Sequence, residues 1–106
     1  MMELKNIMKL LGGLEIPIAY HHFAEGESPE PPFLIYLTPG SHNFSADGMV
    51  YFKVKQLDVE LYTDKKDLAL EEELEKILDA QGIFYNKTET YIKSEKLYEV
   101  LYELEV

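Results

Sequence analysis

Cysteine, tryptophan and arginine are all absent from this chain of 106 residues. Without cysteine the chain has neither disulfides nor thiolate ligands for a metal, which fits a reducing compartment. Its charge is also one-sided, because 20 acidic residues stand against ten lysines and give a formal net charge of −10. Phosphate backbones and anionic membranes select cationic surfaces. We therefore expect no nucleic-acid partner and no membrane partner.

Long apolar runs are missing as well. The longest contain only a few residues, whereas a helix needs roughly 20 to span a bilayer. The first residues, MMELKNIMKLLGG, carry Glu3 and lack the basic start and long apolar centre of a secretion signal. The length and the hydrophobic fraction of 46% are typical of one globular domain. We expect a soluble, acidic, cytosolic protein with a single domain over residues 1–106.

Two segments have the apolar spacing of helices that bury one stripe. The first ends at Gly12 and has the stripe Leu4, Ile7, Met8 and Leu11. The second follows Asp67, a plausible N-cap, ends before Gly82 and has the stripe Leu70, Leu74, Ile77 and Leu78. The acidic run Glu71–Glu75 is interpreted as the exposed side of the second helix. A docking surface for a basic partner is the alternative.

The remaining apolar segments have the pattern of strands. They are Ile16–Phe23, Phe33–Leu37, Met49–Tyr62, Ile83–Tyr85 and Tyr98–Val106, with polar loops predicted over 24–32 and 39–48. Within Met49–Tyr62 the apolar residues change parity at Lys55-Gln56, which implies a bulge or a strand that changes its covering layer. This order predicts an α+β fold, a two-layer sandwich with a mainly antiparallel sheet of four to five strands and two helices packed on one face.

Few residues offer chemistry. His21 and His22 are adjacent in a predicted strand and should point to opposite faces, so they are poor candidates for a shared metal unless His42 folds back to join one. Ser41 or Ser45 with His42 lacks the strand, elbow and helix of a hydrolase, so turn-forming serines are the simpler explanation.

Two carboxylates and several tyrosines complete the candidates. Asp58 and Glu60 share one strand face, which is interpreted as solvated and charged because Lys53 and Lys55 also alternate out of this segment. Tyr98 and Tyr102 fit core positions, whereas Tyr51, Tyr62 and Tyr91 suit protein interfaces. We therefore expect no catalytic, cofactor-binding or metal-binding residues, no cofactor, and no enzymatic activity.

Several phrases together resemble a known family. They are IPIAYHHFAEGESPEPPFLIYL near the start, the predicted long strand with its NFSADG loop, ELYTDKKDLALEEELEKIL, and SEKLYEVLYELEV at the end. These segments, which extend over almost the whole chain, are similar to the small tail-completion or head–tail joining proteins of long-tailed phages and prophages of Gram-positive bacteria. The resemblance rests on general pattern, because this family has no catalytic motif to match.

The resemblance implies a structural virion component that resembles tail terminators. Such proteins pack an antiparallel sheet with helices and assemble as a ring at the end of the tail tube, which then meets the connector of the head. The expected partners are therefore further copies of the chain, most plausibly six, together with tail-tube and head-connector proteins. The expected location is the virion, and the host cytoplasm during assembly. The alternative function is a small α+β ligand-binding or regulatory domain.

Overall fold

The computed structural model describes residues 3–24, 26–41, 43–46, 48–52 and 54–106, and for 44–46 and 50–52 it describes the backbone alone. The described part of the chain contains α1 (Leu4–Leu11), a 3₁₀ turn (Gly12–Leu14), β1 (Ile18–Tyr20), β2 (Phe33–Leu37), β3 (Phe44–Ala46), β4 (Met49–Phe52), β5 (Gln56–Thr63), α2 (Leu68–Ala80), β6 (Tyr85–Ile92) and β7 (Leu97–Glu105).

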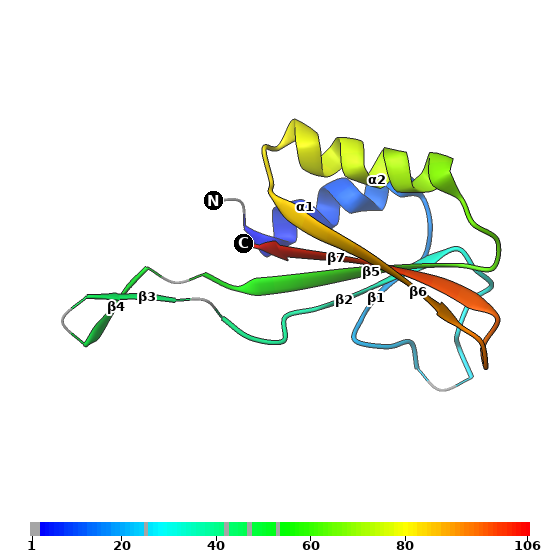
Figure 1. Cartoon of the computed structure of the whole chain (residues 1–106), viewed down its shortest axis with the longest axis horizontal. Helices are drawn as coiled ribbons and strands as arrows, with labels where there is room; N and C mark the ends of the chain where they lie inside the picture. Colours follow the sequence, from blue (N-terminus) through cyan, green and yellow to red (C-terminus); the bar gives the residue numbers. More distant parts are fainter. Residues whose placement is uncertain (1–2, 25, 42, 47, 53) are drawn as a thin grey trace.

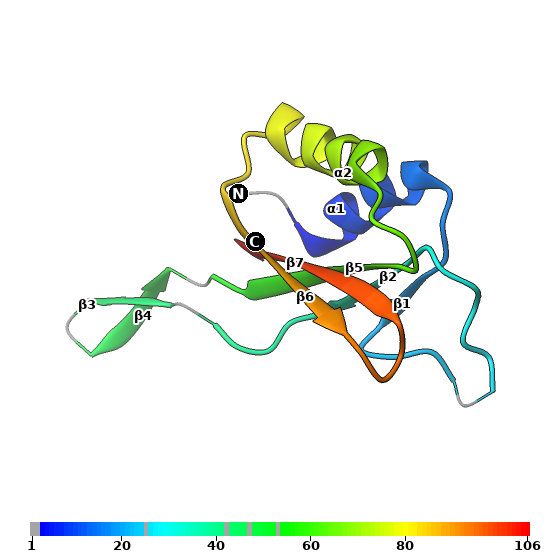
Figure 2. The ribbon, with the colours of Figure 1, turned by 45° about the vertical axis from the view of Figure 1, so that its right-hand side comes forward.

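Five strands form the main sheet, in the order β1-β2-β5-β7-β6. Only β1 and β2 pair in parallel, and the other three pairings are antiparallel. Both helices lie over the same face of this sheet, so the opposite face has no helix on it (Figures 1 and 2). The predicted α+β fold is thereby confirmed. The parallel pair was not predicted.

The core lies between the helices and the sheet. Residues of β5 alternate strictly between buried and half-buried, and Leu57, Val59 and Leu61 face the helices with no exposed surface. The helices contribute their predicted stripes, of which Ile7, Leu11, Leu74 and Leu78 are buried. Each such fully buried side chain stabilises the fold by about 1.5–3 kcal/mol relative to an exposed one. The core therefore fixes which face of the sheet is left over.

The predicted long strand Met49–Tyr62 is two strands, so that prediction was wrong. The chain leaves β4 after Phe52 and enters β5 at Gln56, and the change of parity marks the passage from one sheet to another. Around this break, the amide of Val54 donates to Asn43 Oδ1 at 3.0 Å, and Lys55 and Val106 exchange two backbone hydrogen bonds of 2.8 Å. The break lies just before Lys55-Gln56, because these two residues continue the pairing with the end of β7.

Strands β3 and β4 form a separate two-stranded sheet. We call residues 41–55, which comprise this sheet and the segments that join it to the body, the hairpin arm. It projects from the body along the direction of the strands (Figure 1), and the molecule measures 49 × 30 × 22 Å. The predicted loop over 39–48 therefore contains a strand. Gly48 has φ of +76° at the tip, as its position after Asp47 suggested, whereas Asp47 lies outside the described residues.

The strand prediction for the segment before β7 was largely wrong, because it did not include most of β6. The predicted strand Ile83–Tyr85 overlaps it only at Tyr85, because the rest of β6 reads Asn-Lys-Thr-Glu-Thr-Tyr-Ile and has no apolar alternation. It is an edge strand whose residues 86–91 are all exposed, so burial leaves little trace in its sequence. Its position is instead set by eight uninterrupted residue pairs with β7.

One acidic residue of α2 is buried, which corrects the interpretation of Glu71–Glu75 as an exposed run. Glu71 is only 2% exposed, because it lies three residues before Leu74 and seven before Leu78 and so shares their face of the helix. Glu72 and Glu73 are exposed as expected, and Asp67 caps the helix by accepting a hydrogen bond from the amide of Leu70 at 3.0 Å.

Two lysines neutralise the buried carboxylate. Lys66 Nζ lies 2.6 Å from Glu71 Oε2 and Lys87 Nζ lies 2.8 Å from Glu71 Oε1. Oε1 receives no hydrogen bond of regular geometry, so its contact with Lys87 is mainly one between charges. Partial burial lowers the pKa of Lys87, but its contacts with Glu71 and then Glu75 outweigh this effect and raise that pKa. The cluster ties α2 to the edge strand β6.

A neighbouring carboxylate extends this cluster. Glu75 Oε2 lies 2.8 Å from Lys87 Nζ and accepts a hydrogen bond of 2.8 Å from the buried Tyr102 hydroxyl. Partial burial raises the pKa of Glu75, but the bonds from Lys87 and Tyr102 lower it further than burial raises it. The stability that Glu75 contributes is therefore present at neutral pH and is lost as the pH falls through its folded-state pKa.

We expect Glu71→Gln to lower the free energy of unfolding by about 1–3 kcal/mol, because the buried side chain would lose its charged contacts with two lysines. Urea denaturation at pH 7 measures the change. Glu72→Gln, an exposed position in the same helix turn, is the matched control and should stay within about 0.5 kcal/mol of the parent. Equal stability of the two variants would show that the cluster contributes nothing.

Candidate interaction surface

The face of the sheet opposite the helices has a chemistry of its own. We call it the open face, and its side chains on the three central strands are Phe33, Ile35, Leu37, Asp58, Glu60, Tyr62, Glu99, Leu101 and Glu103. Neither helix covers it in any view of the ribbon (Figures 1 and 2), although Phe33 and Ile35 of β2 are buried. Its position follows from the core, because residues that alternate with helix-facing ones must point away.

Four carboxylates form an acidic strip on the open face. Asp58 of β5 is directly opposite Glu103 of β7, and Glu60 and Glu99 lie on the same two strands. Within the described residues none of the four forms an ion pair with a lysine. Like charges placed opposite each other in a sheet destabilise it by about 0.2–1 kcal/mol per pair. The acidic strip therefore lowers the stability of the isolated subunit.

The pKa of Glu99 is raised in the acidic strip. Partial burial first, and then the nearby charge of Glu60, raise the pKa of Glu99, while a hydrogen bond with Tyr62 works in the opposite direction. The hydroxyl of Tyr62 also donates to Glu60 Oε2 at 2.6 Å, so one tyrosine links the two carboxylates. Burial and the acidic neighbours raise the pKa of Tyr62 as well. A cation placed here would relieve the repulsion.

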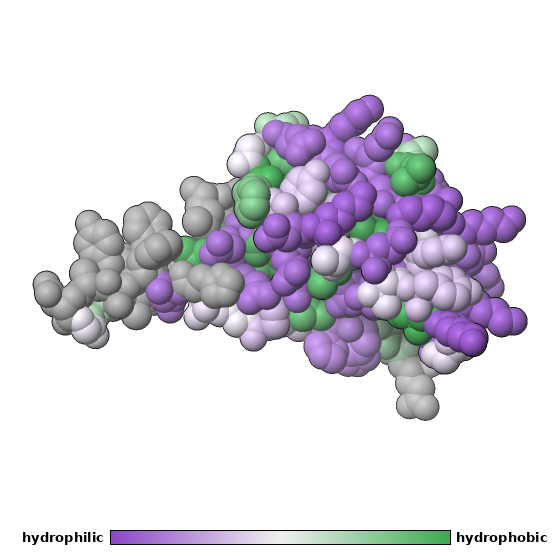
Figure 3. All heavy atoms as spheres, in the orientation of Figure 1, coloured by the Kyte–Doolittle hydropathy of each residue, from purple (hydrophilic) through white to green (hydrophobic). Residues whose placement is uncertain are grey.

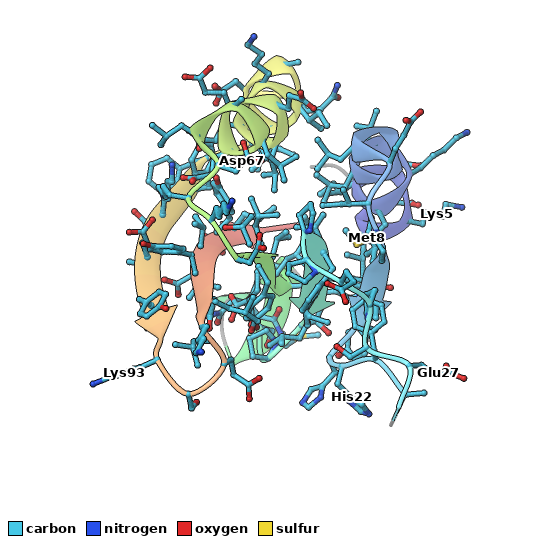
Figure 4. The ribbon with its side chains drawn as sticks, turned by 90° about the vertical axis from the view of Figure 1, so that its right-hand side faces the viewer. Lys5, Met8, His22, Glu27, Asp67 and Lys93 are labelled. Atoms are coloured by element: carbon cyan, nitrogen blue, oxygen red, sulfur yellow. The ribbon has the colours of Figure 1, made fainter. Side chains whose placement is uncertain are left out.

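One end of the open face is hollowed into an aromatic groove of about 830 Å³. Phe33 stacks on Tyr62 with ring centroids 5.1 Å apart and meets Phe23 edge-on at 5.4 Å. The walls are the connection from β1 to β2 and the turn from β6 to β7. Figure 4 shows their labelled residues His22, Glu27 and Lys93 on the side of the sheet away from the helices. The open face therefore joins an apolar groove to an acidic strip.

The histidine pair is arranged differently from the prediction. His21 has φ of +64° just beyond β1, so the two rings do not point to opposite faces, and their Nδ1 atoms lie 3.0 Å apart. The described residues contain no group of three His, Asp or Glu side chains able to hold a metal ion.

The other candidate residues are only partly described. Ser41 forms an isolated bridge with Lys55 at the base of the hairpin arm, whereas His42, Lys53 and the side chains of Ser45 and Tyr51 lie outside the described residues. The serine–histidine pair therefore stays untested. Asp58 and Glu60 do share a charged face, but both are half-buried there.

Of the two tyrosines predicted for the core, only Tyr102 lies there, whereas Tyr62 and Tyr91 are partly exposed as predicted and the side chain of Tyr51 lies outside the described residues. Tyr102 is fully buried and Tyr98 is half-buried, whereas Tyr91 is 50% exposed on the edge strand and Tyr62 is half-buried on the open face. In the orientation of Figure 1, the body presents mostly hydrophilic side chains, with hydrophobic ones in small separate spots (Figure 3). Among the described residues, no helix combines the length and the apolar character needed to cross a membrane.

No protein-family model matches the chain, and no curated protein sequence matches it significantly.

We expect Glu99→Gln to stabilise the protein at pH 7 by about 0.5–1 kcal/mol, because it removes one charge from the acidic strip. The folded-state pKa of Glu99 is raised, so the folded protein holds this proton more tightly than the unfolded chain does. The destabilisation therefore grows as the pH rises from the ordinary glutamate value through the raised one.

Urea denaturation between pH 4 and pH 8 checks this expectation. The advantage of Glu99→Gln over the parent should shrink toward pH 4, because Glu99 takes up its proton in the folded state and increasingly in the unfolded state as well. Glu95→Gln, in the exposed turn after β6, should show no such pH-dependent advantage. A constant difference across this range would contradict the assigned repulsion.

Proposed function

We propose that this protein is a non-enzymatic structural component of a phage or prophage, which acts in tail completion or head–tail joining by assembling into a ring. The sequence resemblance suggests the class. The observation that carries the proposal is the hairpin arm, because β3 and β4 pair with each other and project from the body. A lone two-stranded hairpin is marginally stable in water at best, so such an arm needs a surface to rest on.

The molecule has two different surfaces suited to contacts between subunits. One is the hairpin arm, and the other is the open face with its acidic strip and groove. A closed ring requires a heterologous interface, in which two unlike patches of the same subunit meet. A five-stranded sheet that carries both helices on one face leaves its other face available for this purpose.

The same proposal identifies the partners of the protein and its location. The ring, with six subunits favoured, caps the tail tube and then meets the head connector, so the protein acts in the host cytoplasm during assembly and remains in the virion. The net charge of −10 would keep free subunits soluble and would steer them toward less acidic partners. No reaction and no cofactor enter this function.

Light scattering of the purified protein across a range of concentrations, alone and with tail-tube protein, tests the proposal. We expect a ring-sized species, or a ring that forms when tail-tube protein is added. A protein that stays monomeric throughout and does not bind tail-tube protein would contradict it.

A thermal-shift screen against metabolites and divalent metals separates the alternative. The assembly function predicts no stabilisation by small molecules. Clear stabilisation by one metabolite would instead favour a ligand-binding or regulatory domain.

A further inference from the structure

We propose that the hairpin arm of one subunit docks on the open face of a second copy of this chain, so that the subunits associate head to tail. This inference rests on the proposed assembly function, and it identifies which two surfaces meet. Three properties support it: the opposite charges of the two surfaces, the apolar side chains on both, and the direction in which the hairpin arm extends.

The two surfaces have opposite charge. Residues 41–55 contain two lysines, Lys53 and Lys55, and one acidic residue, in a chain whose net charge is −10. Lys55 is exposed at the base of the hairpin arm. The open face offers Asp58, Glu60, Glu99 and Glu103, which form no ion pair with a lysine among the described residues. A basic segment laid on this strip would bring counter-charges to these carboxylates and relieve the repulsion between them.

The two surfaces also share apolar character. Met49, the first residue of β4, is 73% exposed, and β4 consists of Met-Val-Tyr-Phe. On the open face, Leu37 and Leu101 are half-buried between the carboxylates, and the aromatic groove continues the apolar surface toward Phe33. Interfaces of stable complexes combine such an apolar centre with a charged rim.

The direction of the hairpin arm excludes docking within one subunit. Its base is closed by the bridge between Ser41 and Lys55 and is fixed to the body by the paired backbone of Lys55 and Val106. From there it extends past the end of the sheet and beyond the body, along the direction of the strands (Figures 1 and 2). A second copy is thus the partner that supplies the complementary face. Repetition of this contact gives a ring if the rotation closes.

A mixing experiment tests the contact. One variant removes the exposed apolar and basic side chains of the hairpin arm without adding a negative charge (Met49→Ser with Lys55→Ser), and the other damages the open face (Asp58→Lys with Glu60→Lys). We expect each variant alone to remain monomeric under conditions in which the parent assembles. A mixture of the two should form dimers and nothing larger, because only one intact arm meets one intact face. Glu72→Lys with Glu73→Lys, the same change of charge on the exposed side of α2, is the matched control and should assemble like the parent.

Cross-linking gives a second readout that does not require stable assembly. The chain has no cysteine, so introduced thiols have no background. We expect a short bismaleimide to join subunits carrying Met49→Cys to subunits carrying Glu60→Cys. It should join Met49→Cys to Glu73→Cys, on the helical side, at least tenfold less. Circular dichroism checks that every variant keeps the fold.

The outcomes separate this contact from the proposed function. If the parent forms rings or binds tail-tube protein while both damaged variants assemble equally well, or if both cysteine pairs cross-link alike, the docking contact is wrong and the assembly function stands. If the parent neither assembles nor binds tail-tube protein, the function itself fails. Dimers in the mixture, with cross-links confined to the open face, establish the contact.

Discussion

The contact between the buried carboxylate of Glu71 and the ammonium groups of Lys66 and Lys87 constrains where helix α2 can lie on the sheet. A charge that is 2% exposed is stable only beside counter-charges, and one of these comes from the edge strand β6. Helix α2 is thereby placed over β7 and β6, and the hydroxyl of Tyr102 is brought to Glu75. With this face of the sheet occupied, the other face is left to the acidic strip and the groove.

The elements that bury a regular stripe could be predicted, because burial determines their sequence. Helices α1 and α2, the N-cap Asp67 and the alternation of β7 are all confirmed. Strand β6 could not be predicted, since an exposed edge strand is specified by the backbone of its neighbour. The parity change at Lys55-Gln56 was informative, but a pattern local to one segment does not reveal that the chain moves into a different sheet.

The sequence predicts the acidic strip and the groove less directly than it predicts the helices and strands. The acidic strip brings together residues of β5 and β7 that are about forty positions apart, so its like-charge pair of Asp58 and Glu103 requires knowledge of strand order and register. Glu71 is a different case, because its spacing to Leu74 and Leu78 already placed it on the buried face of the helix. That signal was present in the sequence and was outweighed by the run of glutamates around it.

The position of the hairpin arm within the chain has an evolutionary consequence. It connects β2 to β5, two adjacent antiparallel strands whose own pairing runs from Phe33–Tyr62 to Leu37–Asp58. The entropic cost of closing such a connection grows slowly with length, by about 0.6 kcal/mol for each doubling. Insertions or deletions at the tip would therefore change the reach of the arm with little effect on the stability of the body. Related chains could accordingly keep one body and adapt the length of the arm to subunits of different size.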